Sequence, residues 1–293
     1  MNIKRYLLYS SYLFGKKIRY IRLMNAFSNY AKILTFHRVN DYDSNFLTTS
    51  RETFEKTIST ISQDYKVISL QSLVEKIKNK ERLGHKTVIV TFDDGYRDNF
   101  LYAAPILRKY DVPATFFVTS GYINTNRVFP WDKQSDKAHA LMTWDEVREL
   151  SHMGFDIGAH TVNHTCLGQL PLEIARIEVT RSKEQIEEQI NMRITAFSYP
   201  VGVPACLRDD VKEVIREAGF DCSCSVYGGK VTEHSDLYDL RRISMYPNTI
   251  ELLMELDNFM TYFDGKMKIN IWLLQVLTSV VLGRRSTCSP DLS

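Results

Sequence analysis

The sequence predicts an α/β fold, specifically a distorted, incomplete (β/α) barrel of about seven parallel strands. Short apolar, β-branched runs alternate with longer segments of helical periodicity between about residues 31 and 247. Strand–helix units of this kind are joined by right-handed crossovers, which make the strands parallel. The strand count fits an incomplete barrel better than a flat, doubly wound sheet. Polar residues also follow directly after two of the runs, where parallel barrels place their chemistry.

The first half of this pattern contains three strands and three helices. Ser50 can cap a helix whose inner face carries Phe54, Ile58 and Ile61. The run Thr87–Phe92 reads as a buried strand because five of its six residues are β-branched. The expected elements are a strand at 32–37, helices at about 50–63 and 69–80, a strand at 87–92, a helix at 99–110 and a strand at 114–119.

The second half begins after a polar, aromatic insertion at residues 121–141. Thr143 and Glu146 form a capping-box pattern that starts the next helix. Gly219 is placed to end a later helix in a left-handed conformation. The expected elements are strands at 155–159 and 194–198, helices at 171–189 and 207–218, and final strands at 220–226 and 242–245.

We expect three regions: a basic leader at 1–30, a central domain at 31–262, and a tail at 263–293 with a short apolar segment at 269–282. The first forty residues hold eight Lys or Arg and no Asp or Glu, so the other 253 residues sum to −6. This leader could lie on an anionic membrane or form a basic helix packed on the barrel. No signal peptide is convincing, and no run reaches the ~20 apolar residues of a spanning helix.

The five cysteines are odd in number and scattered along the chain. Such a set is more typical of reduced thiols than of a disulfide framework. We therefore expect a cytoplasmic protein, with peripheral contact to the inner face of the plasma membrane as one option. Nothing in the composition points to a nucleic-acid partner, and the oligomeric state is left open.

Two short motifs carry the chemistry. Asp93 and Asp94 follow the buried strand at 87–92, and His160 and His164 stand four residues apart after the strand at 155–159. Residues at i and i+4 can aim at one point from a single helical turn. Two imidazoles and one carboxylate make a metal site with open positions, which leaves the second carboxylate free to accept a proton. The pattern favours metal-assisted hydrolysis.

These motifs resemble those of the polysaccharide deacetylases, the NodB-homology family of carbohydrate esterases, over about residues 33–247. Thr91-Phe92-Asp93-Asp94-Gly95 is similar to the family's first motif and His160-Thr161-Val162-Asn163-His164 to its second. Phe197-Ser198-Tyr199-Pro200-Val201-Gly202 resembles the third. The first strand, Leu34-Thr35-Phe36-His37-Arg38-Val39, is similar to the Tyr-His-x-Val strand of the poly-N-acetylglucosamine deacetylases, the branch that this chain resembles. The resemblance implies a NodB-type barrel with its site at the carboxyl ends of the strands.

The resemblance also implies residue roles. Asp94, His160 and His164 would hold a divalent metal, by default Zn²⁺, although Co²⁺, Ni²⁺ or Fe²⁺ would also suit the set. Asp93 would be the general base, and the backbone N–H of Val201 would stabilise the oxyanion.

Two further roles are less direct. The late histidine that many relatives use as general acid is absent, and His37 is the better candidate for that role here. Alternatively, His37 has only a structural role. His234 is the other candidate for the acid. Arg242 could orient Asp93, because Ser198 stands where several relatives carry arginine; otherwise it is a surface arginine.

The aromatic residues Tyr96, Tyr199 and Trp131 could bind a sugar ring, although most such residues belong to the core or rim. The function implied is removal of N-acetyl groups from an N-acetylated glycan or glycan precursor. The alternatives are an O-acetyl esterase or other amide hydrolase on the same fold, and an inactive carbohydrate-binding relative. Intact Asp93, Asp94, His160 and His164 argue against the last.

Overall fold

The structure is a computed structural model. It describes residues 5, 9, 10, 12, 13, 28–133, 135, 137, 139–244, 246 and 248–258. The predicted C-terminal tail, its apolar segment and Cys288 therefore lie outside the described residues, as does most of the leader. None of the described helices is long and apolar enough to cross a bilayer.

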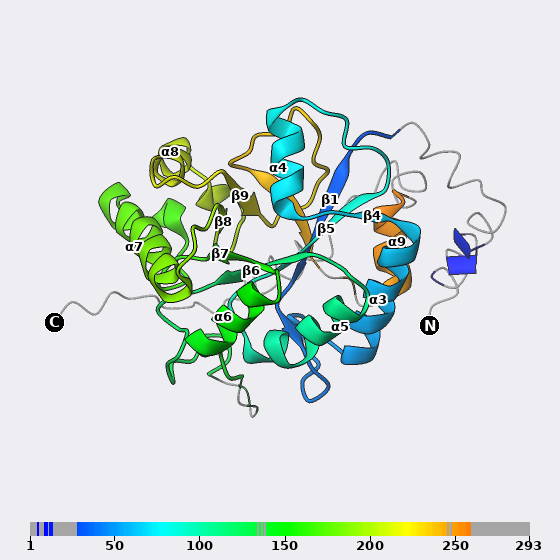
Figure 1. The fold of residues 1–293 in the computed structure, drawn as a ribbon, viewed down its shortest axis with the longest axis horizontal. Coiled ribbons are helices and arrows are strands. Elements are labelled where there is room, and N and C mark those ends of the chain that lie inside the picture. The colour runs from blue at the N-terminus through cyan, green and yellow to red at the C-terminus, as the bar shows by residue number, and fades with distance from the viewer. Residues whose placement is uncertain are drawn as a thin grey trace.

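Seven parallel strands form a closed ring, in the order β1-β10-β9-β8-β7-β6-β5 and back to β1 (Figure 1). This confirms the predicted barrel and its strand count, one fewer than in an eight-stranded (β/α) barrel. The short strand β4 (Lys66–Val67) pairs with the first residues of β5. The ring strands are β1 (Ala31–Phe36), β5 (Thr87–Phe92), β6 (Ala114–Val118), β7 (Asp156–Ala159), β8 (Ala196–Ser198), β9 (Cys222–Ser225) and β10 (Leu240–Ser244).

Helices follow most strands and cover the outside of the ring. Ser50, Ser69 and Thr143 each cap a helix through the side-chain oxygen, and Thr143 with Glu146 completes the predicted capping box. The helices are α3 (Arg51–Asp64), α4 (Leu70–Lys78), α5 (Ala104–Lys109), α6 (Trp144–His152), α7 (Leu172–Ile190), α8 (Asp209–Glu217) and α9 (Thr249–Leu256).

The main difference from the predicted helices lies after the first motif. The single helix expected at 99–110 begins as one π-helical turn, Asn99–Ala103, and continues as α5, which has a proline in its first turn. Proline lacks the N–H that an α-helical bond would need, so the chain changes its hydrogen-bond pattern before Pro105. Two short strands, β2 (Arg38–Val39) and β3 (Thr48–Thr49), and the helix α9 were not predicted.

Side chains alternate between the inside and the outside of the ring, as strand geometry requires. The outer residues Val88, Val90 and Phe92 of β5 join the core under the helices, whereas Ile89 joins a second core with Ile33 and Phe117. Helix α4 contributes Leu70, Leu73 and Val74 to that second core. The helix therefore closes the amino-terminal end of the barrel, at the top of Figure 1.

Gly158 of β7 makes room inside the ring. A Cβ atom at this position would lie 2.4 Å from the ring of Phe117. Phe117 can therefore fill the barrel only because the neighbouring strand has no side chain there. The guanidinium carbon of Arg242 lies 5.4 Å from the centroid of this ring. Phe117 therefore separates the polar residues at the carboxyl ends of the strands from the amino-terminal end of the barrel.

The described residues of the leader contact α9. Tyr12 is buried and donates a hydrogen bond to Asp257 Oδ2 over 2.7 Å, and Arg5 and Tyr9 both bond to Glu251. These contacts agree with the packed-helix alternative for this part of the leader. The membrane alternative concerns the remaining basic residues.

Candidate metal and catalytic site

The carboxyl ends of β1, β5, β7, β8 and β10 bring the predicted polar residues together. Thr91 and Asp93 continue the inner face of β5, and His160 directly follows β7. Asp94 has a left-handed backbone with φ of 77°, which turns the chain sharply and aims its carboxylate at the two histidines. Non-glycine residues rarely adopt this conformation, and such strained positions cluster at functional sites.

Asp94, His160 and His164 form a group that could hold a metal ion. Their ligand atoms all lie within 4.8 Å of one another. The Nε2 atoms of His160 and His164 are 3.5 and 3.2 Å from Asp94 Oδ1. That oxygen is buried and has no hydrogen-bond partner among the described residues. A buried carboxylate oxygen without a donor is costly, and a cation between the three groups would compensate it.

The second nitrogen of His160 supports this reading. Its Nδ1 lies 2.8 Å from the carbonyl oxygen of Ser198. A carbonyl oxygen can only accept a hydrogen bond, so Nδ1 must be the donor. The hydrogen bond places the proton on Nδ1 and leaves the lone pair of Nε2 facing Asp94. Metal-binding histidines typically show this arrangement. Burial opposes ionisation of Asp94, but the two histidines outweigh it and hold the pKa of Asp94 well below its usual range.

The histidines do not share a helical turn, which corrects the prediction. Residues 160–164 form a loop in which Thr161 and His164 have left-handed φ values of 63° and 56°. Glu178 of α7, a residue the sequence analysis missed, holds this loop. Its Oε2 accepts hydrogen bonds from the N–H groups of Val162 and Asn163, each over 2.9 Å. Its Oε1 accepts a third, over 2.6 Å, from the Asn163 side chain.

Asp93 points to the opposite side of the site, where the guanidinium group of Arg242 binds it through both Nη atoms. Arg242 Nη1 and Nη2 each lie 2.7 Å from one carboxylate oxygen of Asp93. The Nη2 group also donates to Ser198 Oγ over 2.7 Å. Arg242 is fully buried, so it is not the surface arginine of the alternative interpretation. Burial of Asp93 opposes its ionisation, but the charge of Arg242 outweighs it and lowers the pKa of Asp93.

His37 directly follows β1 and lies in the field of both carboxylates. Burial lowers its pKa, and the charges of Asp94 and Asp93 oppose that shift. Asn99 donates a hydrogen bond to the His37 carbonyl over 2.8 Å, which ties its backbone to the turn after the first motif. His234 is exposed in a loop whose residue Val231 pairs with Ala31 at the start of β1. It therefore lies at the other end of the barrel from the carboxylates.

The predicted sugar-binding aromatic residues differ in exposure. Tyr96 and Tyr199 are 1% and 0% exposed, so protein covers both ring faces and neither can stack on a sugar. Trp131 is 39% exposed, and its ring centroid lies 4.7 Å from that of His164. Trp131 therefore forms an accessible wall beside the metal-site residues. Val201, with φ of 63° and an exposed fraction of 50%, lies on the loop after β8.

A buried network holds Trp131 in place. Asp132 binds Arg38 Nη1 through one oxygen, over 2.7 Å, and accepts a hydrogen bond from the Tyr96 hydroxyl through the other, over 2.6 Å. The indole N–H of Trp131 donates to the same hydroxyl over 2.9 Å. Tyr96 thus supports the aromatic wall from within, a role the sequence did not indicate.

Two cysteines correct the expectation of reduced thiols. Cys166 and Cys206 form a disulfide between the histidine loop and the loop after β8. Gly168 allows the two segments to meet, because a Cβ atom there would lie 2.2 Å from the Ala205 carbonyl oxygen. Cys222 and Cys224 are free and buried. Forty residues separate the bonded pair, so the pairing depends on the tertiary fold.

Comparisons with known proteins agree with this geometry. Residues 80–223 match the family model described as polysaccharide deacetylase. The chain is 23% identical over 262 residues to the poly-β-1,6-N-acetyl-D-glucosamine N-deacetylase of Staphylococcus epidermidis, with 84% of this chain and 87% of that protein covered.

Two solved structures share the fold. IcaB from Ammonifex degensii matches with a TM-score of 0.68 and 22% identity, over 78% of this chain and 97% of that one. The deacetylase PplD of Streptococcus pyogenes, solved in complex with acetate, matches with a TM-score of 0.66 and 24% identity, over 78% and 99%.

Proposed function

Because the chain belongs to the polysaccharide deacetylase family, matched over residues 80–223, we propose that it removes N-acetyl groups from a glycan or glycan precursor in a metal-dependent hydrolysis. The observation that carries this proposal is the convergence of Asp94, His160 and His164 beside an ionised Asp93. The named staphylococcal relative is an N-deacetylase of poly-β-1,6-N-acetyl-D-glucosamine, so a polymer of N-acetylated hexosamine is the first substrate to test.

A divalent ion held by the three ligands would polarise the acetyl carbonyl and lower the pKa of a water molecule. Zinc is our first choice, because two imidazoles and one carboxylate with an open position is a typical catalytic zinc set. Co²⁺, Ni²⁺ and Fe²⁺ share these ligand preferences.

Asp93 acts as the general base in this proposal. Its carboxylate is ionised at neutral pH, because Arg242 lowers its pKa. Arg242 holds both oxygens in a fixed plane, and Ser198 links the pair to the loop that carries Val201. Asp93 would accept the proton of the attacking water, and the N–H of Val201 would donate to the oxyanion that develops from the acetyl carbonyl oxygen.

His37 is the proposed general acid, which protonates the leaving amine. The late strand β10 supplies Arg242 and no histidine, and His37 is the additional imidazole in the field of the carboxylates. His37→Ala should keep metal affinity and lose roughly 10²- to 10⁴-fold in rate, the usual range for one proton donor. A near-normal rate in this variant would contradict the assignment.

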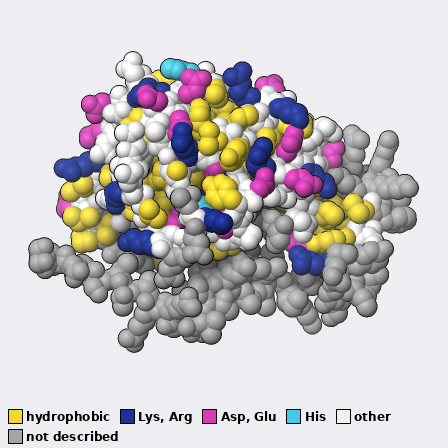
Figure 2. Space-filling model, turned by 90° about the horizontal axis from the view of Figure 1, so that it is seen from below, with side chains coloured by type: hydrophobic (Ala, Val, Ile, Leu, Met, Phe, Trp, Pro, Cys, Tyr) yellow, Lys and Arg dark blue, Asp and Glu magenta, His cyan; other side chains and the backbone are white. Residues whose placement is uncertain are grey.

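Exposed apolar side chains around the barrel mouth support a glycan substrate. Tyr42 and Phe46 are 44% and 70% exposed in the loop after β2, and the partly exposed Trp131 lies beside His164. Figure 2 views this end of the molecule from below and shows hydrophobic side chains interspersed with charges of both signs. Exposed aromatic side chains can pack against the apolar faces of a sugar ring. A surface that carried charges of one sign only would suit a sugar less well.

The disulfide indicates the kind of cellular compartment in which the enzyme would act on its substrate. Bridges persist in oxidising compartments and are rare in a reducing cytosol. We therefore propose that the domain matures in an oxidising compartment, in place of the cytoplasm expected from the cysteine count. A finished glycan outside the cytosol then becomes a better candidate than a nucleotide-linked precursor.

An acetate-release assay tests the function. Purified full-length protein is incubated with poly-β-1,6-N-acetyl-D-glucosamine, chitooligosaccharides, peptidoglycan fragments and O-acetylated xylan. We expect release from an N-acetylated glycan, its loss with a chelator and its recovery with Zn²⁺. Release from the xylan alone would favour the O-acetyl esterase, and binding without release would favour the inactive relative. Full activity in chelator would refute the metal assignment.

A further inference from the structure

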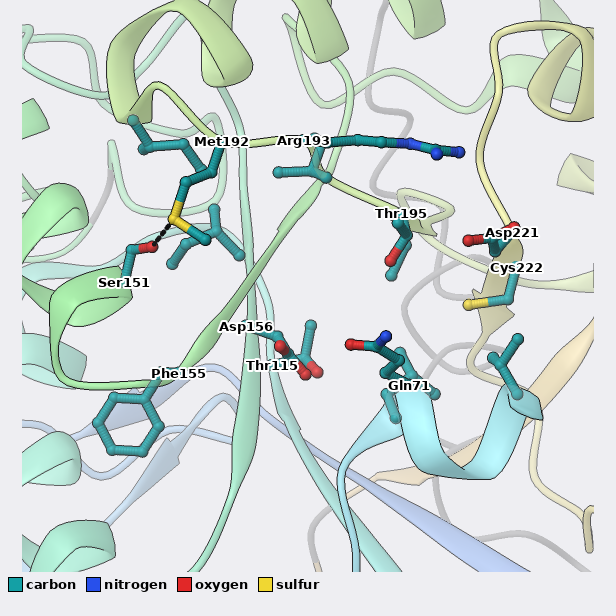
Figure 3. Close-up of a pocket in the computed structure, with 16 residues that line it drawn as sticks. Gln71, Thr115, Ser151, Phe155, Asp156, Met192, Arg193, Thr195, Asp221 and Cys222 are labelled. Carbon is teal, nitrogen blue, oxygen red and sulfur yellow. Dashed lines mark hydrogen bonds between the residues drawn. The ribbon is translucent and has the colours of Figure 1, made fainter. Parts of the chain in front are cut away.

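A cavity of about 250 Å³ lies at the amino-terminal end of the barrel, away from the metal-site residues. Its walls come from the first residues of β6, β7, β8 and β9, the first turn of α4, and the segment between α7 and β8 (Figure 3). The metal-site residues follow the opposite ends of the same strands. The volume suits one small molecule rather than a glycan chain.

Two polar side chains in this cavity lack partners. Thr115 and Asp156 stand opposite each other in the β6–β7 register, and Figure 3 shows them together in the middle of the pocket. Thr115 is 1% exposed, and its buried Oγ1 has no hydrogen-bond partner. Asp156 is half-buried, and within the described part of the chain neither a hydrogen bond nor a cation acts on its carboxyl group. Native proteins rarely leave a buried group such as the Thr115 hydroxyl unsatisfied, and the half-buried Asp156 lies directly opposite it.

The cation that lines the cavity, Arg193, does not pair with this carboxylate. Arg193 is exposed, and its guanidinium donates to the Gly219 carbonyl at the rim. Lys78 outside the cavity is paired with Asp221 over 2.8 Å. Burial raises the pKa of the Asp156 carboxyl group. The remaining lining is largely apolar: Leu70, Val74, Phe155, Ile157, Ile194 and Ala196.

We propose that this cavity is a second binding site, which takes a small hydroxylated primary amine. The ammonium group would pair with Asp156, and a hydroxyl would donate to Thr115 Oγ1. The amide of Gln71 and the hydroxyl of Thr195 also line the space and supply further hydrogen bonds. An ammonium ligand with a hydroxyl group would bind both the Asp156 carboxylate and the Thr115 hydroxyl. An anion would be repelled by the Asp156 carboxylate.

Glucosamine is the probe, because it combines an ammonium group with ring hydroxyls. N-acetylglucosamine has the same ring without the charge and is the matched comparison. Binding is measured calorimetrically with full-length protein that also carries Asp94→Asn, so that the metal site does not turn over either sugar. We expect glucosamine to bind at least ten-fold more tightly than N-acetylglucosamine.

Substitutions in the cavity locate the binding. Asp156→Asn should weaken glucosamine at least ten-fold, and Thr115→Val should weaken it to a smaller extent. Ser151→Ala is the matched control, because Ser151 lines the cavity but donates to Met192 Sδ over 3.2 Å, as the dashed line in Figure 3 shows. This control should bind glucosamine normally. Equal binding by Asp156→Asn and the parent, or no binding by the parent, would overturn the proposal.

Stability without ligand gives an independent readout. The pKa of Asp156 is raised in the folded state, so its destabilising effect is absent below the unfolded pKa and develops as pH rises through the folded pKa. Asp156→Asn should therefore melt higher than wild type at neutral pH, with the difference vanishing in acid. A lower melting temperature at neutral pH would mean that Asp156 already has a partner, which contradicts the site. Because Asp156 lies outside the proposed catalytic residues, these results do not depend on deacetylase activity.

Discussion

Asp93 and Asp94 are adjacent and chemically identical, but their surroundings differ. Asp94 faces two imidazole nitrogens and keeps one oxygen without a donor, whereas both oxygens of Asp93 are bound by Arg242. The side chains of successive residues at the end of a strand point in opposite directions, and the left-handed φ of Asp94 adds to this separation. The same pair can therefore supply a metal ligand and a base.

This separation predicts two different mutant phenotypes. Asp94→Asn should lose both metal and activity, because a ligand is removed. Asp93→Asn should bind metal and substrate almost normally and lose kcat, because asparagine cannot accept the proton at neutral pH. Metal analysis and steady-state kinetics of both variants test this. Metal loss in Asp93→Asn with retention in Asp94→Asn would reverse the roles.

Glu178 is the residue that shapes the histidine loop, through three hydrogen bonds to Val162 and Asn163. Glu178→Ala should weaken metal binding roughly 10- to 100-fold, the usual cost of removing a group that supports metal ligands. A chelator competition titration measures this without any assay of activity. Glu184→Ala is the control, because Glu184 is exposed on the same helix. Equal affinity in the two variants would show that the loop holds its own shape.

At the scale of elements, the disulfide joins two loops that carry different parts of the site. The short helical turns Leu167–Gln169 and Pro204–Cys206 meet at Gly168, and the Cys166–Cys206 bond connects the loop of His164 to the loop of Val201. The bond therefore couples the position of a metal ligand to that of the proposed oxyanion donor.

Removing this bond should destabilise the fold. A closed loop of about 40 residues stabilises by about 4 kcal/mol through the restricted unfolded chain. The double variant Cys166→Ser, Cys206→Ser should lose stability of that order in denaturant unfolding, and reductant should have no further effect on it. Reductant should destabilise the wild type by a similar amount. A wild type that unfolds identically with and without reductant would show that the bond does not form.

At the scale of the whole molecule, charge is distributed unevenly. The first forty residues carry +8, and the rest of the chain carries −6. The described leader residues are already engaged, because Arg5 pairs with Glu251 and Tyr12 bonds to Asp257. Any attraction to an anionic membrane has to come from the other basic residues, each worth on the order of 1 kcal/mol near the surface.

This distribution predicts salt-sensitive co-sedimentation with anionic liposomes. Changing four leader residues, Lys16, Lys17, Arg19 and Arg22, to glutamine should abolish it while keeping the Arg5 and Tyr12 contacts. The matched control neutralises four basic residues of the central domain: Lys76, Lys78, Lys80 and Arg82. Equal sedimentation of both variants would show that the leader has no special affinity for the membrane.

The sequence by itself determined most of the strands and helices and the motif residues. Strand Thr87–Phe92, the caps at Ser50 and Thr143, and the barrel class follow from local patterns, because periodicity and capping act within a few residues. The positions of the motifs also predicted that Asp93, Asp94, His160 and His164 lie at one end of the barrel. Each motif follows a strand, and parallel strands end on the same side.

Only the tertiary structure decided which residues touch. The Arg242–Asp93 pair spans 149 residues, the disulfide 40, and the Glu178 contacts join a helix to the loop before it. Burial made Tyr96 and Tyr199 internal and left Trp131 exposed, although all three looked alike in the sequence. The physical reason is that pairing, burial and left-handed loops such as residues 160–164 depend on packing between distant segments, which local propensity does not encode.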